Sequence, residues 1–200
     1  TVAYGVYGDV ARADNDHQVL LQYDVSDWGR YARPLSEAAP HRQGPAAVDG
    51  KYFVRTGNTT YGVQTLAYDA EAGRWFMGVY QGRKLAFPNY LLFAVEAEAR
   101  PARGDLIGVP DTAGEGWEQG MLLPLAADGL EDPATGLRGW RRKADVGLQA
   151  LGSGLFYVAE NSGGKGAQTA DIVLMRWTGD PEAPFAPVDA DERSRRLAMR

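Results

Sequence analysis

The chain has 200 residues, the length of one domain or two small ones, and such a chain can bury about 70 % of its unfolded surface. Its net charge of −5 has the wrong sign for a nucleic-acid-binding protein, and a hydrophobic content of 44 % excludes global disorder. Cysteine is absent, which excludes disulfides, thiolate metal sites and thiol nucleophiles. The two histidines, His17 and His41, cannot supply a three-histidine zinc site.

The 25 glycines and 11 prolines divide the chain into short segments and argue against a helical bundle. No run of about 18 apolar residues is present, so no membrane partner is expected. No signal-peptide pattern is visible either. The lack of cysteine is compatible with export and with the cytoplasm, and we favour a secreted or periplasmic location without a decisive signal.

Strands are predicted in chain order from short runs of aromatic and β-branched residues bounded by turn residues. The first run, 2–7, is followed by a polar loop and a second run at 17–24. Four further strands follow, joined by short loops, at 51–56, 61–69, 74–80 and 89–96. Consecutive strands with short connections favour an antiparallel meander.

The pattern repeats toward the C-terminus, where strands are predicted at 154–159 and 171–178 with a polar loop between them. The last strands align by eye, as VLLQYD at 19–24, YLLFAVE at 90–96 and IVLMRWT at 172–178. A helix is predicted over 188–200, because acidic residues precede arginines there in the order that a helix dipole favours.

On this strand pattern the chain resembles a β-propeller, with 51–96 as one four-stranded blade and 1–24 and 117–178 as parts of its neighbours. The resemblance implies an all-β fold of antiparallel four-stranded meanders, in a single domain over 1–187 with a helical tail at 188–200. Since two and a half blades do not close a ring, it also implies missing blades or a partner chain. A β-sandwich or barrel explains the same strands and stays open as the alternative.

In a meander the loops alternate between two edges, so the loops at 8–17, 57–60, 81–88 and 160–170 are expected on one edge. We call this the polar edge, because it gathers carboxylates, cations and amides beside tyrosines. Polar groups around aromatic rings suit a glycan, and arginine suits the carboxylate of a uronic acid. The predicted substrate-binding residues are Arg55, Asn58, Tyr61, Arg83, Tyr90 and Asn161.

Two chemical interpretations of this edge are open. Glycan hydrolysis or elimination needs a carboxylate pair, for which Asp16 and Glu160 are the candidates. Asp14 and Asp16 could together offer oxygen ligands to calcium, although the Gly and Glu of an EF-hand loop are absent. An Asx-rich turn before a strand explains the same acids, and no other cofactor is expected.

Other readings compete with the glycan hypothesis, and whether the protein is an enzyme stays undecided at this stage. Hairpin loops are polar simply because they are solvated. A non-catalytic interaction module is the alternative function, with strand edges at 1–7 or 171–178 pairing with a partner chain. A nucleophile at Thr1 is a third hypothesis.

Overall fold

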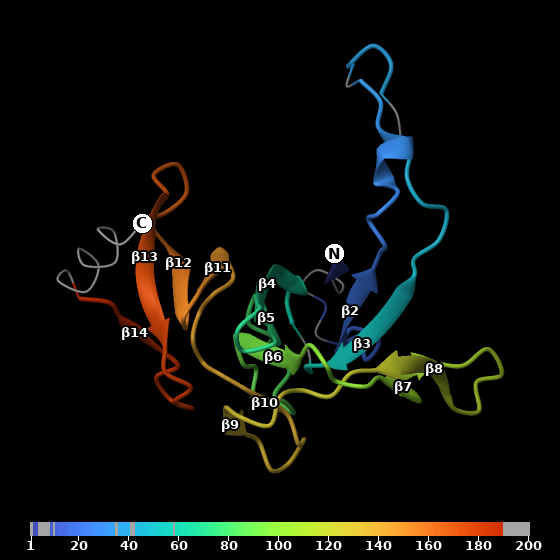
Figure 1. The fold of residues 1–200 in the computed structure, drawn as a ribbon. Helices are drawn as coiled ribbons and strands as arrows, with labels where there is room; N and C mark the ends of the chain where they lie inside the picture. The colour runs from blue at the N-terminus through green and yellow to red at the C-terminus, as the bar shows by residue number, and fades with distance from the viewer. Residues whose placement is uncertain are drawn as a thin grey trace.

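The computed structural model describes residues 2–3, 9, 11–34, 36–40, 43–57 and 59–189 (Figure 1). Strands make up the regular structure of these residues apart from one 3-10 turn, Trp28–Tyr31. The predicted all-β fold with antiparallel sheets is therefore confirmed. None of the described helices is long and apolar enough to cross a membrane.

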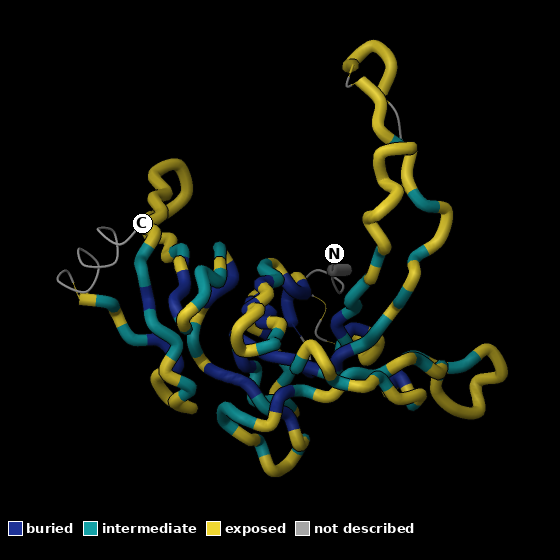
Figure 2. The backbone as a smooth tube through the Cα atoms, in the orientation of Figure 1, coloured by how far each residue is buried: buried dark blue, intermediate teal, exposed yellow. Residues whose placement is uncertain are grey.

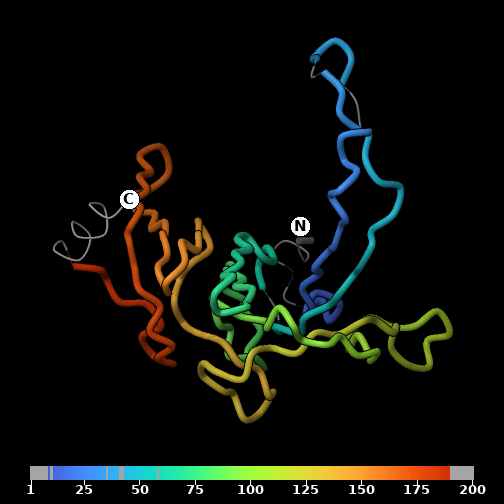
Figure 3. Tube along the Cα trace, viewed as in Figure 1, coloured from blue at the N-terminus to red at the C-terminus, as the bar shows by residue number. Residues whose placement is uncertain are grey.

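The largest sheet has five strands, and we call it the five-stranded sheet. Its strands, in spatial order, are β1 (Val2–Ala3), β2 (His17–Gln22), β3 (Gly50–Arg55), β8 (Trp117–Leu122) and β7 (Ala102–Pro110). The pairing of β3 with β8 is parallel and the others are antiparallel. Figure 3 shows that the connection between β2 and β3 extends away from the sheets, and most of its described residues are exposed (Figure 2).

A three-stranded antiparallel sheet follows, formed by β4 (Val63–Asp69), β5 (Arg74–Val79) and β6 (Leu92–Glu96). The prediction of one four-stranded blade over 51–96 is wrong, because β3 belongs to the five-stranded sheet. Both edges of β3 are occupied, by β2 on one side and β8 on the other. Gly57, with φ of 69°, turns the chain away after β3.

The C-terminal sheet is a four-stranded antiparallel meander of β11 (Gly147–Gly152), β12 (Leu155–Ser162), β13 (Thr169–Trp177) and β14 (Phe185–Pro187). It confirms the strands predicted at 154–159 and 171–178. The predicted exposed edge at 171–178 is covered only in part, since β12 pairs along one side of β13 and β14 pairs with Met175–Trp177 alone on the other. A small hairpin of β9 (Leu130–Glu131) and β10 (Arg138–Gly139) precedes this sheet.

The three-stranded sheet is the middle layer, because apolar side chains cover both of its faces. Phe76 points to the four-stranded sheet and packs on Phe156 and Trp177, with ring centroids 5.5 and 4.8 Å away. Met77, on the opposite face of β5, belongs to a second apolar cluster that includes Val54 of β3. Fully burying each such side chain stabilises the fold by roughly 1.5–3 kcal/mol.

The described residues thus stack three sheets and form neither a closed propeller nor a closed barrel. The predicted helical tail falls mostly on residues 190–200, which lie outside the described residues, as do Thr1, His41 and Asn58.

Candidate functional site

Three of the four loops assigned to the polar edge do meet. The 81–88 loop reaches the 11–16 turn, where the Lys84 Nζ donates to Asp16 Oδ1 at 2.6 Å. The 59–60 segment joins them, since the Thr60 hydroxyl donates to the backbone oxygen of Gln81. These loops meet because they close strands of two packed sheets, and not, as predicted, the edge of one blade.

Asp16 lies at the centre of this edge, but its carboxylate is not open to a ligand. The Asp16 and Lys84 side chains are only 13 % and 14 % exposed, and each neutralises the other. Burial raises the pKa of Asp16, and the hydrogen bond from Lys84 opposes that rise. A largely buried carboxylate that is paired with an ammonium ion has a structural role, because the pairing occupies the oxygen that a nucleophile would need.

His17 is the neighbouring titratable group, at the start of β2 and opposite Arg55 of β3. Burial, and secondly the charge of Arg55, lower the pKa of His17 from 6.5 to about 4. Its Nδ1 is buried and has no hydrogen-bond partner among the described residues. The imidazole is therefore neutral at neutral pH.

The structure does not bring Glu160 to Asp16. Glu160 lies on β12 and pairs with Arg142, and the next residue, Asn161, accepts a 2.7 Å hydrogen bond from Lys143. In Figure 1 the three-stranded sheet separates β12 from β2. The 160–170 loop therefore does not join the other three, and the two carboxylates have separate cationic partners.

The remaining predicted binding residues differ in their exposure and in their contacts. Tyr61 is exposed and packs edge-on against Tyr80, with ring centroids 5.3 Å apart. Arg83 is exposed, whereas Arg55 is partly buried beside His17. Tyr90 is only 3 % exposed, so it cannot offer a ring face to a sugar. Asn58, as stated above, lies outside the described residues.

The predicted calcium ligands are both engaged by cations. Asp14 pairs with Arg12, and the hydrogen bond from Arg12 lowers the pKa of Asp14. Asp16 is held by Lys84. Over the described part of the chain, no group of three acidic or histidine side chains is arranged to hold a metal ion.

A more open feature lies between two sheets, and we call it the inter-sheet groove. It has a volume of 470 Å³. Its walls come from the five-stranded and three-stranded sheets and from the segments that follow β6 and β8, through Leu20, Leu21, Gln22, Tyr23, Tyr52, Leu66, Trp75, Val95, Glu96, Ala97, Ala99, Pro101 and Leu123. This volume is in the range of small-ligand sites.

Aromatic side chains are the distinctive feature of the groove. Trp75 on β5 is 36 % exposed and lies against Tyr68 of the adjacent strand, with ring centroids 4.7 Å apart and planes tilted by 31°. Tyr52 of β3 and Tyr23, which directly follows β2, contribute from the opposite wall. The groove thus joins an exposed indole, backed by a second ring, to two phenols.

Polar groups accompany these rings. The Tyr52 hydroxyl donates to Gln22 Oε1 at 2.8 Å. Glu96 is oriented by Arg74, whose guanidinium donates to Glu96 at 2.5 Å and to Asp128 at 2.7 Å. The Gln22 amide and the Glu96 carboxylate therefore stand in fixed positions on an otherwise apolar wall.

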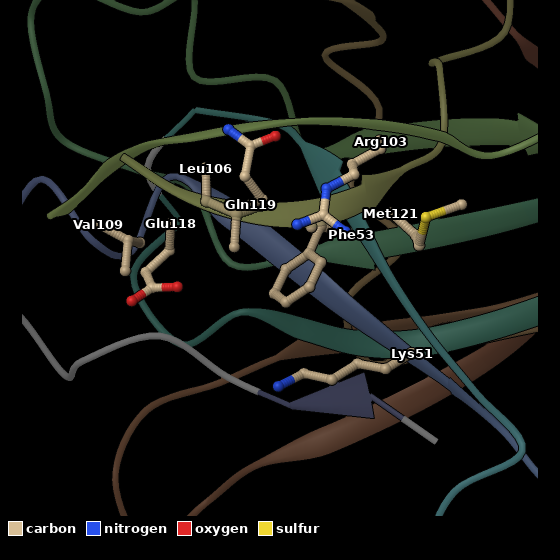
Figure 4. A pocket seen from close by; sticks show the side chains of 9 residues that line it. Lys51, Phe53, Arg103, Leu106, Val109, Glu118, Gln119 and Met121 are labelled. Atoms are coloured by element: carbon tan, nitrogen blue, oxygen red, sulfur yellow. The ribbon is translucent and has the colours of Figure 1, made fainter. Parts of the chain in front are cut away.

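A second concavity, which we call the outer hollow, lies against β3, β7 and β8 and has a volume of 510 Å³ (Figure 4). It is lined by Lys51, Phe53, Arg103, Leu106, Val109, Glu118, Gln119, Gly120 and Met121. Lys51 and Phe53 alternate with Tyr52 along β3, so the outer hollow and the inter-sheet groove use opposite faces of that strand.

Reasoning from the sequence missed both concavities. Trp75 was not among the predicted binding residues, although its place one residue before the buried Phe76 puts it on the other face of a strand. The groove and the hollow also depend on the parallel pairing of β3 with β8, whose paired residues lie about 70 positions apart. No local signal in the sequence specifies that pairing.

Comparisons with known proteins return no similarity that would assign the chain to a family. No protein-family model matches it, no curated protein matches it, and no solved structure matches it. The geometry of the site must therefore carry the functional argument.

Proposed function

We propose that the protein binds a glycan in the inter-sheet groove, with Trp75 as the stacking platform. The observation that carries this proposal is the exposed Trp75 ring, backed by Tyr68, in a groove that also holds Tyr23 and Tyr52. A sugar ring has an apolar face and a rim of hydroxyls, so it needs an aromatic surface with hydrogen-bonding groups at its border.

The polar groups of the groove suit hydroxyl recognition. Gln22 offers both an amide donor and an acceptor, and Glu96 accepts from hydroxyls. Because Arg74 is shared between Glu96 and Asp128, the three side chains keep a net negative charge, which disfavours an acidic sugar. A neutral sugar unit is the ligand that this arrangement favours.

Binding without cleavage is the form of the proposal that the groove supports. Glycoside hydrolysis needs two carboxylates about 5–10 Å apart. Of the described residues that line the groove, Glu96 is the single carboxylate, and Asp16 and Glu160 are not among them. We therefore propose a carbohydrate-binding role and no catalytic step.

The test is calorimetric titration with neutral oligosaccharides of glucose, xylose, mannose and galactose. We expect one class to bind and Trp75→Ala to weaken its binding about tenfold or more, since an aromatic contact contributes about 0.5–1.5 kcal/mol beyond its buried area. Trp117→Ala is the matched control, because Trp117 is similarly exposed and lies outside the groove. Equal losses for both variants, or binding unchanged by Trp75→Ala, would contradict the proposal.

An interaction module stays as the second candidate function. The observation in its favour is that β1 is the terminal strand of the five-stranded sheet, so a further strand could add beside it. Light scattering coupled to gel filtration tests this candidate. A monomer at all accessible concentrations would contradict the interaction module, and glycan binding would then be the single remaining candidate.

A further inference from the structure

The outer hollow differs from the groove in charge. Lys51 and Arg103 line it from β3 and β7, and Glu118 lines it from β8. Neither Lys51 nor Arg103 forms an ion pair or a side-chain hydrogen bond with any described residue. By contrast Arg74, which holds the groove residue Glu96, is paired with two carboxylates.

An aromatic ring lies between the two cations. In Figure 4 the Phe53 ring is drawn between the side chains of Lys51 and Arg103, with Glu118 at the side. The Lys51 Nζ is 5.2 Å from the centroid of that ring. The hollow therefore presents an apolar ring face flanked by positive charge.

Phe53 can pack this close to β8 because position 120 is glycine. A Cβ at Gly120 would lie 2.7 Å from the Phe53 ring and 2.9 Å from Leu106. The Phe53 ring thus rests directly on the backbone of β8. Packed in this way, the ring is a firm floor for a ligand.

We propose that the outer hollow binds a uronate unit of a glycan, with its carboxylate between Lys51 and Arg103 and its ring on Phe53. Arginine can hold a carboxylate through two parallel hydrogen bonds, and lysine adds a point charge. Glu118 would accept from the sugar hydroxyls. An inorganic anion would use the two cations and make no use of the Phe53 ring, so the aromatic floor favours a ring-bearing acid.

This inference goes beyond the proposed function, because it concerns a second site and a charged sugar. The hollow and the groove lie on opposite faces of β3, so their variants can be separated. Trp75→Ala acts on the groove alone, whereas Lys51→Gln and Arg103→Gln act on the hollow alone.

The experiment is calorimetric titration at low ionic strength with trigalacturonate and with its carboxyl-reduced, neutral counterpart. We expect trigalacturonate to bind at least about tenfold more tightly than the neutral trisaccharide. Lys51→Gln and Arg103→Gln should each lower the affinity for trigalacturonate about tenfold. Trp75→Ala should leave the difference in affinity between the two trisaccharides intact. Lys165→Gln is the charge-matched control, because Lys165 is exposed in the β12–β13 hairpin and unpaired among described residues.

Three results would overturn this inference. The first is equal affinity for the acidic and the reduced trisaccharide. The second is a loss on Lys165→Gln equal to that on Arg103→Gln, which would indicate a diffuse charge effect. The third is equally tight binding of triglutamate or inorganic phosphate, which would show that any anion suffices. If neutral glycans bind and depend on Trp75 in any of these cases, the proposed function still holds.

Discussion

Burial acts in opposite directions on two neighbouring residues, His17 and Asp16. It disfavours the charged form of each, so it lowers the pKa of the imidazole to about 4 and raises the pKa of the carboxyl group. The sequence drew attention to Asp16, because it stands in a dense acidic turn. It could not identify Lys84 as the partner, because contact across 68 positions follows from sheet packing.

His17 predicts a pH dependence of stability. Its pKa is depressed in the folded protein, so its contribution is present above about pH 6.5 and is lost as the pH falls toward 4. We expect the free energy of unfolding to fall over this range by at most about 3 kcal/mol through this residue. Urea denaturation of the wild type and of His17→Gln at several pH values measures the difference. A difference between the two proteins that does not change with pH would contradict the assignment.

Breaking the Asp16–Lys84 pair should lower the free energy of unfolding without changing glycan affinity. Lys84→Met leaves a half-buried carboxylate without its cation, and we expect a loss of about 1–3 kcal/mol in the free energy of unfolding. Combining it with Asp16→Asn should recover part of that loss. Glycan affinity should stay unchanged in Lys84→Met, in the double variant and in Asp16→Asn alone, because neither residue lines the groove. Loss of glycan binding in a folded Asp16→Asn protein would contradict the groove and place the glycan site at the polar edge.

Individual strands were predictable, and their partners were not. The runs at 51–56, 61–69, 74–80 and 89–96 correspond to β3, β4, β5 and β6, which begin at residues 50, 63, 74 and 92. Alternation and turn residues are local signals, so they identify a strand wherever it ends up. The assignment of β3 to another sheet depends on β8, whose side chains at Met121 and Leu122 give no local indication of a partner.

Glycine 78 offers a test at the level of one strand. A Cβ at Gly78 would lie 2.1 Å from the backbone oxygen of Ala144, so Gly78→Ala forces β5 away from the segment before β11. We expect a loss of about 1–3 kcal/mol in the free energy of unfolding. Gly164→Ala is the control, because nothing lies within 4 Å of its Cβ position, and we expect a change within about 0.5 kcal/mol. Guanidinium denaturation of both variants checks the prediction.

At the level of the whole molecule, three sheets are stacked, and the three-stranded sheet is the middle layer. The all-β class followed from composition and strand pattern, because glycine and proline left little room for helices. The stacking order did not follow, since it depends on which face of each sheet is apolar after pairing. The groove was out of reach for the same reason, as its two walls belong to different sheets.

Phe76 tests the stack itself. It is fully buried between the middle sheet and the four-stranded sheet, where its ring packs on Trp140, Phe156 and Trp177. We expect Phe76→Ala to reduce the free energy of unfolding by about 3–5 kcal/mol. Tyr157→Ala, at an exposed position of β12, should change it by about 0.5 kcal/mol or less. Denaturation monitored by near-ultraviolet circular dichroism measures both variants. Similar losses of unfolding free energy for the two would contradict a core shared by these sheets.

The most direct test of the glycan proposal is to follow the five tryptophan indole signals by 1H–15N NMR during titration with a neutral oligosaccharide that binds. The Trp75 signal is assigned by its disappearance in Trp75→Phe. We predict that this signal shifts in a saturable manner while the Trp117 signal does not move, since the sugar ring covers Trp75 in the inter-sheet groove. A saturable titration that leaves the Trp75 signal in place would contradict the account and place the ligand elsewhere.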